Sequence, residues 1–299
     1  MPMHFNEINS IHELHRYYQC GPPQHPLITV IDLGAVHPER PETEAFYSLS
    51  LFSIMCKGFD GTIKYGRSAY DFSEGTLMFM APHQVVAISP EIKDVKGWAL
   101  FFHPDLLAGS ALRQKIHEYS FFYYDVNEAL HVSDEENRLL LEVLNRIRGE
   151  YAQNMDRHTH TLINDHLQLL LSYCSRFYDR QFLTREVMGT ELVQRFEKIL
   201  REYFLQEDLV ERGLPDVKWF AAQLHLSPGY LSDLLHRYTG KTTLEYIHLA
   251  LVDKAKALLG DTTKPVGEIA YELGFAHPSH FTKLFKAKVG LSPREFRKG

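Results

Sequence analysis

The side chains with the broadest chemical potential in this sequence are its 17 histidines, because imidazole is the commonest protein ligand for transition metals. A metal-binding strand would need a His-x-His pair, with a third histidine further along the chain. In the strand-rich part of the chain, His83 and His103 lie far apart, and the His158/His160 pair comes just before a predicted helix. These spacings do not predict a metal site, and we expect neither a metal nor another cofactor.

No other catalytic arrangement is recognisable. The sequence contains no nucleophile elbow, phosphate-binding loop or dinucleotide fingerprint, so an enzyme is not predicted. Its three cysteines (Cys20, Cys56 and Cys174) are odd in number and far apart, which argues against a disulfide framework and indicates a reducing cytoplasm. No apolar signal region is found, and no run approaches the ~18 apolar residues that a bilayer span needs. We therefore expect a cytoplasmic protein without membrane attachment.

Charged residues are distributed unevenly around a formal net charge of −6. From Leu214 onwards there are twelve Lys and Arg against eight Asp and Glu, whereas the rest of the chain has 20 against 30. Near the C-terminus, a group of basic side chains has only Glu295 as an acidic neighbour: Lys283, Lys286, Lys288, Arg294, Arg297 and Lys298. An acidic body with a basic end predicts two domains, of which the second meets an anionic polymer.

The basic end contains an internal repeat. Residues 217–224 match residues 266–273 at an offset of 49, and after one inserted residue Gly240 matches Gly290 at an offset of 50. Each copy has the pattern of a short helix with a central alanine, a tight turn, and a second helix that begins at Pro228 or Pro278. This pattern predicts two helix-turn-helix motifs, at 217–240 and 266–290.

The segment between the two copies reads as a connecting helix. Thr242 and Glu245 form a predicted capping box, an apolar stripe follows, and Gly260 is expected just past the helix end. Such a helix of about 17 residues would span roughly 25 Å. Two recognition helices held in this way could enter successive major grooves, which lie roughly 34 Å apart.

The outward faces of the two recognition helices supply the expected contacts with DNA. The candidates for base contact are Gly229, Tyr230, Ser232, Asp233, His236, Ser279, His280, Thr282 and Lys283. The candidates for phosphate contact are Arg237, Lys241, Lys286, Arg294 and Arg297. A carboxylate in the groove is repelled by phosphate, so Asp233 either accepts from a cytosine amino group or pairs with a neighbouring cation, and we favour the pairing.

Several short motifs connect these features to a known family. They are Glu268-Ile-Ala270, Gly274-Phe275, His280-Phe281, Leu284-Phe285-Lys286, Gly290-Leu-Ser-Pro293 and Phe296-Arg297. In this order and spacing, about a third of the chain resembles the DNA-binding domain of AraC/XylS-type bacterial transcription regulators. The resemblance implies promoter or operator DNA as a partner, a cupin-like N-terminal sensor domain, a small-molecule effector, a homodimer and contact with RNA polymerase.

Residues 27–103 have the pattern of strands. Alternation over residues 46–54 predicts one half-buried strand with Tyr47, Leu49 and Leu51 on one side, and frequent turn signals favour an antiparallel sandwich or small barrel. A capping box at Ser133 and Glu136 begins a predicted helix, a second follows at 162–177, and a hinge is expected at 184–189. Aromatic residues could line an effector pocket or form ordinary core: Phe46, Phe52, Phe72, Phe79, Trp98 and Phe101.

Together these patterns predict an α+β chain. It would comprise an N-terminal antiparallel β-barrel of cupin-like type at 1–130, helices for dimerisation at 131–185 and an all-α DNA-binding domain at 186–299. The predicted function is sequence-specific transcription regulation in response to an effector bound in the barrel. Two alternatives stay open at this point: a metal-dependent cupin enzyme with an accessory helical domain, and a dimerising regulator with no effector.

Overall fold

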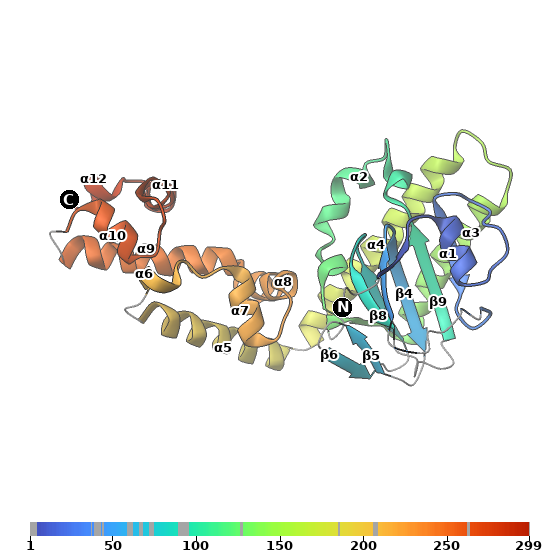
Figure 1. Cartoon of the computed structure of the whole chain (residues 1–299), viewed down its shortest axis with the longest axis horizontal. Helices are drawn as coiled ribbons and strands as arrows, with labels where there is room; N and C mark the ends of the chain where they lie inside the picture. The colour runs from blue at the N-terminus through green and yellow to red at the C-terminus, as the bar shows by residue number, and fades with distance from the viewer. Residues whose placement is uncertain are drawn as a thin grey trace. The chain divides into compact units, whose positions relative to one another are not determined.

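The computed structural model describes residues 5–36, 38, 43, 45–58, 62–65, 68–71, 75–88, 96–125, 128–184, 186–205, 209–261 and 264–298. The chain forms two compact units, Met1–Thr184 and Arg185–Gly299 (Figure 1). Throughout the described part of the chain, helices are too short or too polar to cross a bilayer.

The first unit is built around β-sheets. A three-stranded sheet has the order β1 (Phe5–Ile8), β3 (Ala45–Leu49) and β8 (Val85–Ile88), with β1 parallel to β3. An antiparallel five-stranded sheet has the order β10 (Leu130–His131), β7 (Thr76–Met80), β4 (Phe52–Gly58), β9 (Lys96–Phe102) and β2 (Ile28–Asp32). A separate hairpin consists of β5 (Thr62–Tyr65) and β6 (Ser68–Asp71).

The single strand predicted for residues 46–54 is wrong, because the chain changes sheets at Ser50 and Leu51. A backbone hydrogen bond marks the break, in which the Ser50 N–H donates to Ile8 O at 3.0 Å. The alternation was nevertheless informative, because Tyr47, Leu49 and Leu51 all lie in one core cluster. A strand that crosses between two sheets around a common core keeps its inward face while it changes hydrogen-bonding partners.

A closed barrel is not formed by the strands that the structure describes. The edges of the three-stranded and five-stranded sheets are not paired with each other, and closure requires such pairing. The two sheets instead share an apolar core, to which the inner face of the five-stranded sheet contributes Met55, Met80, Ala99 and Phe101. Helix α1 (Ile11–Tyr17) adds Ile11 and Leu14 to the same core.

Helices cover the other face of the five-stranded sheet. Helix α3 (Asp134–Ala152) contacts that face through Asn137, whose Oδ1 accepts from Trp98 Nε1 at 3.3 Å and from Cys56 Sγ at 3.6 Å. Helix α4 (Thr159–Thr184) packs along α3, and its Tyr178 ring lies 5.9 Å from the ring of Phe79. Short helical segments connect β9 to β10: η1 (Pro104–Leu107), α2 (Leu112–Lys115), η2 (Ile116–Glu118) and η3 (Ser120–Tyr123).

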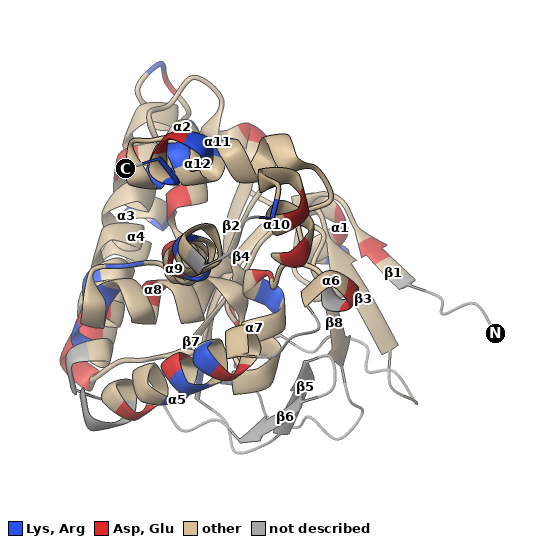
Figure 2. Cartoon of the chain, turned by 90° about the vertical axis from the view of Figure 1, so that its left-hand side faces the viewer, with Lys and Arg blue, Asp and Glu red and all other residues tan. Residues whose placement is uncertain are grey.

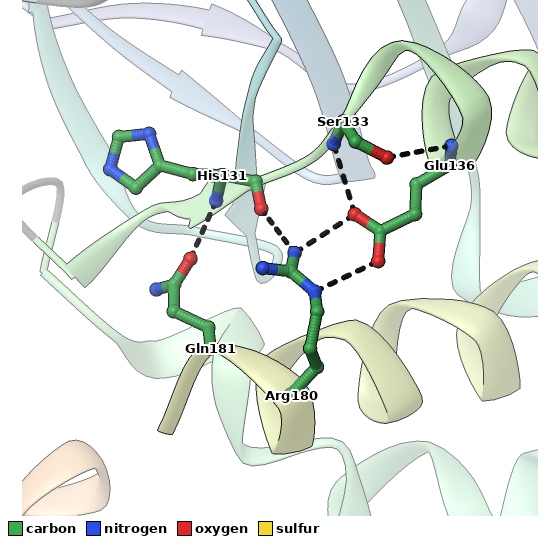
Figure 3. Close-up of polar contacts among 5 residues, drawn as sticks. All are labelled: His131, Ser133, Glu136, Arg180 and Gln181. Atoms are coloured by element: carbon green, nitrogen blue, oxygen red, sulfur yellow. Dashed lines mark hydrogen bonds and ion pairs between the residues drawn. The ribbon is translucent and has the colours of Figure 1, made fainter. Parts of the chain in front are cut away.

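A polar network joins α4 to the start of α3 (Figure 3). The predicted capping box is confirmed, since Glu136 N donates to Ser133 Oγ and Ser133 N donates to Glu136 Oε2. The Arg180 guanidinium donates to both carboxylate oxygens of Glu136, at 2.8 and 2.9 Å, and to His131 O at 2.7 Å. Gln181 Oε1 accepts from His131 N at 2.7 Å. These bonds fix α4 against β10.

The described residues of the second unit form helices joined by turns and short loops, without a strand. Its helices are α5 (Glu186–Leu205), α6 (Leu209–Arg212), α7 (Val217–Leu224), α8 (Pro228–Thr239), α9 (Thr243–Asp261), α10 (Val266–Glu272), α11 (Pro278–Val289) and α12 (Pro293–Phe296). The division between the two units, at Thr184 and Arg185, falls within the expected hinge at 184–189, although residues 186–189 of that segment are helical. The predicted end of the connecting helix is wrong, because Gly260 lies inside the last turn of α9. The helix continues past this glycine, which helix ends tolerate at modest cost.

Candidate nucleic-acid interface

The two copies of the repeat have the same backbone geometry. In the turn after α7, His225 is left-handed (φ 57°) and Leu226 N donates to Ala221 O at 2.9 Å. In the turn after α10, Gly274 is left-handed (φ 85°) and Phe275 N donates to Ala270 O at 3.0 Å. Equivalent residues thus make equivalent bonds at an offset of 49, which confirms both helix-turn-helix motifs.

Both recognition helices, α8 and α11, begin and end at equivalent positions. Pro228 and Pro278 stand in the first turn, and Gly240 and Gly290 end the helices in the left-handed conformation. Their starts differ, however, because Ser227 Oγ accepts from Tyr230 N at 3.2 Å whereas no side chain caps α11.

Helix α9 connects the two motifs. Its predicted capping box is confirmed, with Thr242 N donating to Glu245 Oε2 at 2.8 Å and Glu245 N donating to Thr242 Oγ1 at 3.4 Å. The helix has 19 residues, which corresponds to about 28 Å at a rise of 1.5 Å per residue. Its buried side, including Ile247, Leu251 and Ala255, belongs to the same core as the inward sides of α8 and α11. The spacing of the two motifs is therefore held by one rigid element.

The outward side of α11 is open to solvent. Ser279, His280, Lys283 and Lys286 are exposed, whereas Thr282 is half-buried and its hydroxyl donates to Pro278 O at 3.0 Å. Lys and Arg residues are concentrated on α11 and α12, while the charged residues of α10 are all acidic (Figure 2). Four of the predicted base-contact residues on α11 thus have a solvent-facing or partly solvent-facing position.

The outward side of α8 is less accessible. Tyr230 is buried, at 6% exposure, and forms part of the packing of the helix. Gly229, Ser232 and Asp233 are half-buried, and Ser232 Oγ donates to Thr243 Oγ1 at 3.1 Å. Only His236, at the C-terminal end, is exposed among the predicted base-contact residues of this helix. The two motifs have the same backbone geometry but expose different side chains.

The predicted phosphate contacts also divide into two groups. Arg237, Lys241, Lys286 and Arg294 are exposed. Arg297 is turned inward, because its Nε donates to Leu259 O at 3.4 Å and its Nη2 is buried without a hydrogen-bond partner. This geometry gives Arg297 a role in attaching the C-terminal turn to α9, which position in the sequence could not distinguish from a surface role.

Lys288, which was not among the expected contacts, is exposed in the last turn of α11. Hydrogen bonds from Thr242 lower the pKa of Glu245, and Lys288 lowers it further. Hydrogen bonds from Ser292 likewise lower the pKa of Glu295, with a contribution from Lys286. Both carboxylates therefore stay ionised at neutral pH and offset part of the positive charge of α11.

The aromatic residues considered for an effector pocket are not brought together. Three lie on the helix-covered face of the five-stranded sheet, where they are buried in core contacts: Phe52, Phe79 and Trp98. Phe101 lies on the opposite face, in the core between the sheets. Phe46 is half-buried on the three-stranded sheet, and Phe72 lies outside the described residues. Within the described residues, no group of three potential metal ligands is found.

Comparison with known proteins finds a family model that matches within the second unit and several relatives of part of the chain. Residues 220–299 match the family model of a helix-turn-helix domain. An uncharacterised HTH-type transcriptional regulator, YisR of Bacillus subtilis (strain 168), is 35% identical over 95 residues, which are 32% of this chain and 32% of YisR. The HTH-type transcriptional activator RhaS of Salmonella schwarzengrund (strain CVM19633) is 37% identical over 93 residues, which are 30% of this chain and 34% of RhaS.

Among solved structures, the C-terminal domain of AraT, a response regulator from Geobacillus stearothermophilus, is 28% identical, with a TM-score of 0.32 over 36% of this chain and 84% of that domain. The matched part of this chain spans only about a third of YisR and RhaS. These relatives are transcription regulators, so the alternative of a metal-dependent enzyme gains no support from them.

Proposed function

We propose that this chain, whose residues 220–299 are a helix-turn-helix domain of the AraC type, is a transcription regulator that binds promoter DNA through both of its motifs. The observation that carries the proposal is the repeated turn geometry at Ala221 and Ala270, with both motifs attached to one helix. A helix of about 28 Å, together with the motifs at its ends, matches the separation of successive major grooves, roughly 34 Å.

Helix α11 is the principal reader in this proposal. Ser279, His280 and Lys283 lie on its exposed N-terminal half, the end that reaches deepest into the groove in this class of motif. Lys286 lies almost one turn further along the helix, so we assign it to phosphate. On α8, the half-buried Gly229 and Ser232 are left as base contacts, and His236, which corresponds to Lys286 at the offset of 50, is assigned to phosphate like that lysine.

The proposal also includes dimerisation through α4. Most apolar side chains of α4 already pack within the first unit, since Ile163, Leu167 and Leu171 are fully buried. Leu162 and Leu169 remain 40% and 43% exposed, one heptad apart. In an antiparallel pair of α4 helices with its twofold axis between residues 170 and 171, Asp165 of one copy faces Arg176 of the other, while Leu162 faces Asp179 and Leu169 faces Ser172. This arrangement rests on the Asp165–Arg176 pair, because the two leucines do not meet in it.

The effector site in this proposal lies on the inner face of the five-stranded sheet. Lys57, Thr76 and His131 stand in one cross-strand row, because Thr76 pairs with both of the others. Thr76 Oγ1 and His131 Nδ1 are 3.3 Å apart, and burial lowers the pKa of Lys57 to about 8. Lys57 also pairs with Gly97, whose left-handed backbone (φ 110°) approaches Cys56 O too closely for any side chain. Such a row favours an anionic small molecule.

The first experiment on DNA binding needs no knowledge of the operator. The affinity of the full chain for a labelled duplex is measured as a function of salt concentration. If Arg237, Lys241, Lys286 and Arg294 each contact a phosphate, the log–log slope should be about −4 per domain. Alanine at any one of them should reduce the slope by about one. Lys198→Ala, an exposed change on α5, is the control and should leave the slope unchanged. A slope near zero would contradict the proposal.

A further inference from the structure

The second unit contains a surface hollow that the proposed DNA contacts do not use. Its volume is about 360 Å³, at the lower end of the range of ligand sites, roughly 300–1,000 Å³. The lining comes from the end of α5, the loop before α7 and the first turn of α7: Tyr203, Leu214, Pro215, Asp216 and Trp219. Residues of the recognition helices α8 and α11 are not part of this lining. The proposed base contacts therefore leave the hollow unoccupied, and we consider a different partner for it.

The aromatic walls of the hollow are held in place by contacts within the unit. The Tyr203 hydroxyl donates to Gly213 O at 3.1 Å, and the Tyr203 ring meets the Trp219 ring at 4.8 Å and 67°. The Trp219 ring also packs on Phe220 at 5.0 Å and 88°, and Phe220 is fully buried. The indole of Trp219 is thus pre-organised although it is only half-buried.

The single charge of the lining is a carboxylate. Asp216 is exposed and caps α7, with its Oδ1 accepting from Trp219 N at 2.7 Å. This bond fixes the carboxylate beside the indole of the same turn. A carboxylate next to aromatic rings attracts a cation, through charge pairing and through the negative faces of the rings. Arginine suits this combination better than lysine, because its planar guanidinium stacks on aromatic rings and pairs with both carboxylate oxygens.

Exposed apolar side chains on the same stretch of chain indicate that the cation belongs to a protein. Leu205 is 79% exposed, Val210 is 61% exposed and Leu214 is 37% exposed. Leu214 lines the hollow itself. An exposed apolar side chain beside a binding site is typical of protein contacts, whereas a free small cation would leave it in water. DNA is a poor occupant, because its phosphates are repelled by Asp216.

We propose that this aromatic–carboxylate hollow binds an arginine side chain of a partner protein, with an apolar neighbour of that arginine resting on Leu214. The site is separate from the DNA contacts. It would let the chain hold promoter DNA and a second protein at the same time.

The test uses the full chain and a defined probe. The probe is a capped tripeptide with arginine between two leucines, and the neutral comparison is the same peptide with citrulline. The readout is the indole N–H signal of Trp219 in a nitrogen-15 correlation spectrum, which Trp219→Phe identifies. We expect the arginine peptide to shift this signal and to bind about tenfold more tightly than the citrulline peptide.

Asp216→Asn separates charge from folding, because asparagine caps helices as well as aspartate does. This variant should keep its melting temperature and bind the arginine peptide about tenfold more weakly, while its affinity for duplex DNA changes less than twofold. Asp253→Asn, an exposed change of the same charge on α9, should bind like the unmodified chain. Equal binding of the two peptides, no shift at Trp219, or an unchanged affinity of Asp216→Asn would each overturn the proposal.

Discussion

Replacing Gly189 by alanine should weaken the contact between α5 and the recognition helix α8. Gly189 lies in the first turn of α5, and the ring of Tyr238 on α8 packs directly over it. A methyl group at position 189 would lie well inside van der Waals distance of the ring carbons and of the hydroxyl oxygen. Either the Tyr238 ring must leave this position or one of the two helices must move.

Two effects of opposite sign set the magnitude. Overpacking of this kind typically costs 1–3 kcal/mol, whereas alanine in place of glycine in a helix is worth up to about 1 kcal/mol. We expect a net loss of about 0–2 kcal/mol in the free energy of unfolding of the second unit, relative to a stabilisation of up to about 1 kcal/mol where the methyl group is unhindered. Gly260→Ala in α9 is the control, because a methyl group there meets nothing within 4 Å, and it should stabilise the unit slightly.

Chemical denaturation of the full chain, followed by the fluorescence of Trp219 in a Trp98→Phe background, measures this difference. A second substitution, Tyr238→Ala, removes the ring and should make Gly189→Ala stabilising in that background. If Gly189→Ala alone stabilises the unit by the same amount as Gly260→Ala, the Tyr238 ring does not clash with the added methyl group, and the expected overpacking is absent.

Three further predictions concern DNA, the dimer and a thiol. Lys283→Ala should reduce the binding free energy on the preferred DNA site by about 1–3 kcal/mol and relax base preference at one position, whereas Lys286→Ala should weaken binding to all duplexes almost equally. If both variants lose the same affinity on every sequence, Lys283 contacts only the DNA backbone. Asp165→Arg should shift sedimentation towards monomer, and adding Arg176→Asp should restore the dimer, unless α4 lies outside the interface. Burial raises the pKa of Cys56 to about 12, so this thiol should resist iodoacetamide at pH 8 until the protein is unfolded. Alkylated Cys56 in a peptide map of protein treated in its folded state would contradict this expectation.

The helix-turn-helix domain could be predicted because its signals are local. The central alanines, the turn residues and the glycine ends all act within a few residues of where they stand, and the repeat presents each signal twice. The capping boxes at Ser133 and Thr242 were predictable for the same reason. The burial of Tyr230 was not, because it depends on how α8 is rotated against its neighbours rather than on its own sequence.

The arrangement of the N-terminal sheets depended on long-range contacts that the sequence did not reveal. Strand alternation placed Tyr47 and Leu51 on the correct face, but it carried no information on the change of sheet at Ser50. The parallel pairing of β1 with β3 joins segments about 40 residues apart. The hollow at Trp219 escaped prediction as well, because its lining combines the end of α5 with a loop and the start of α7.

Selection of bound duplexes from a random pool with the full chain shows whether both motifs read DNA. We expect enrichment of sites with two short sequence blocks, centred about 10–10.5 base pairs apart, one for each motif. Substitution of Ser232 should relax one block, and substitution of His280 should relax the other. Enrichment of no sequence, or of a single block that both substitutions affect alike, would contradict DNA reading by two motifs.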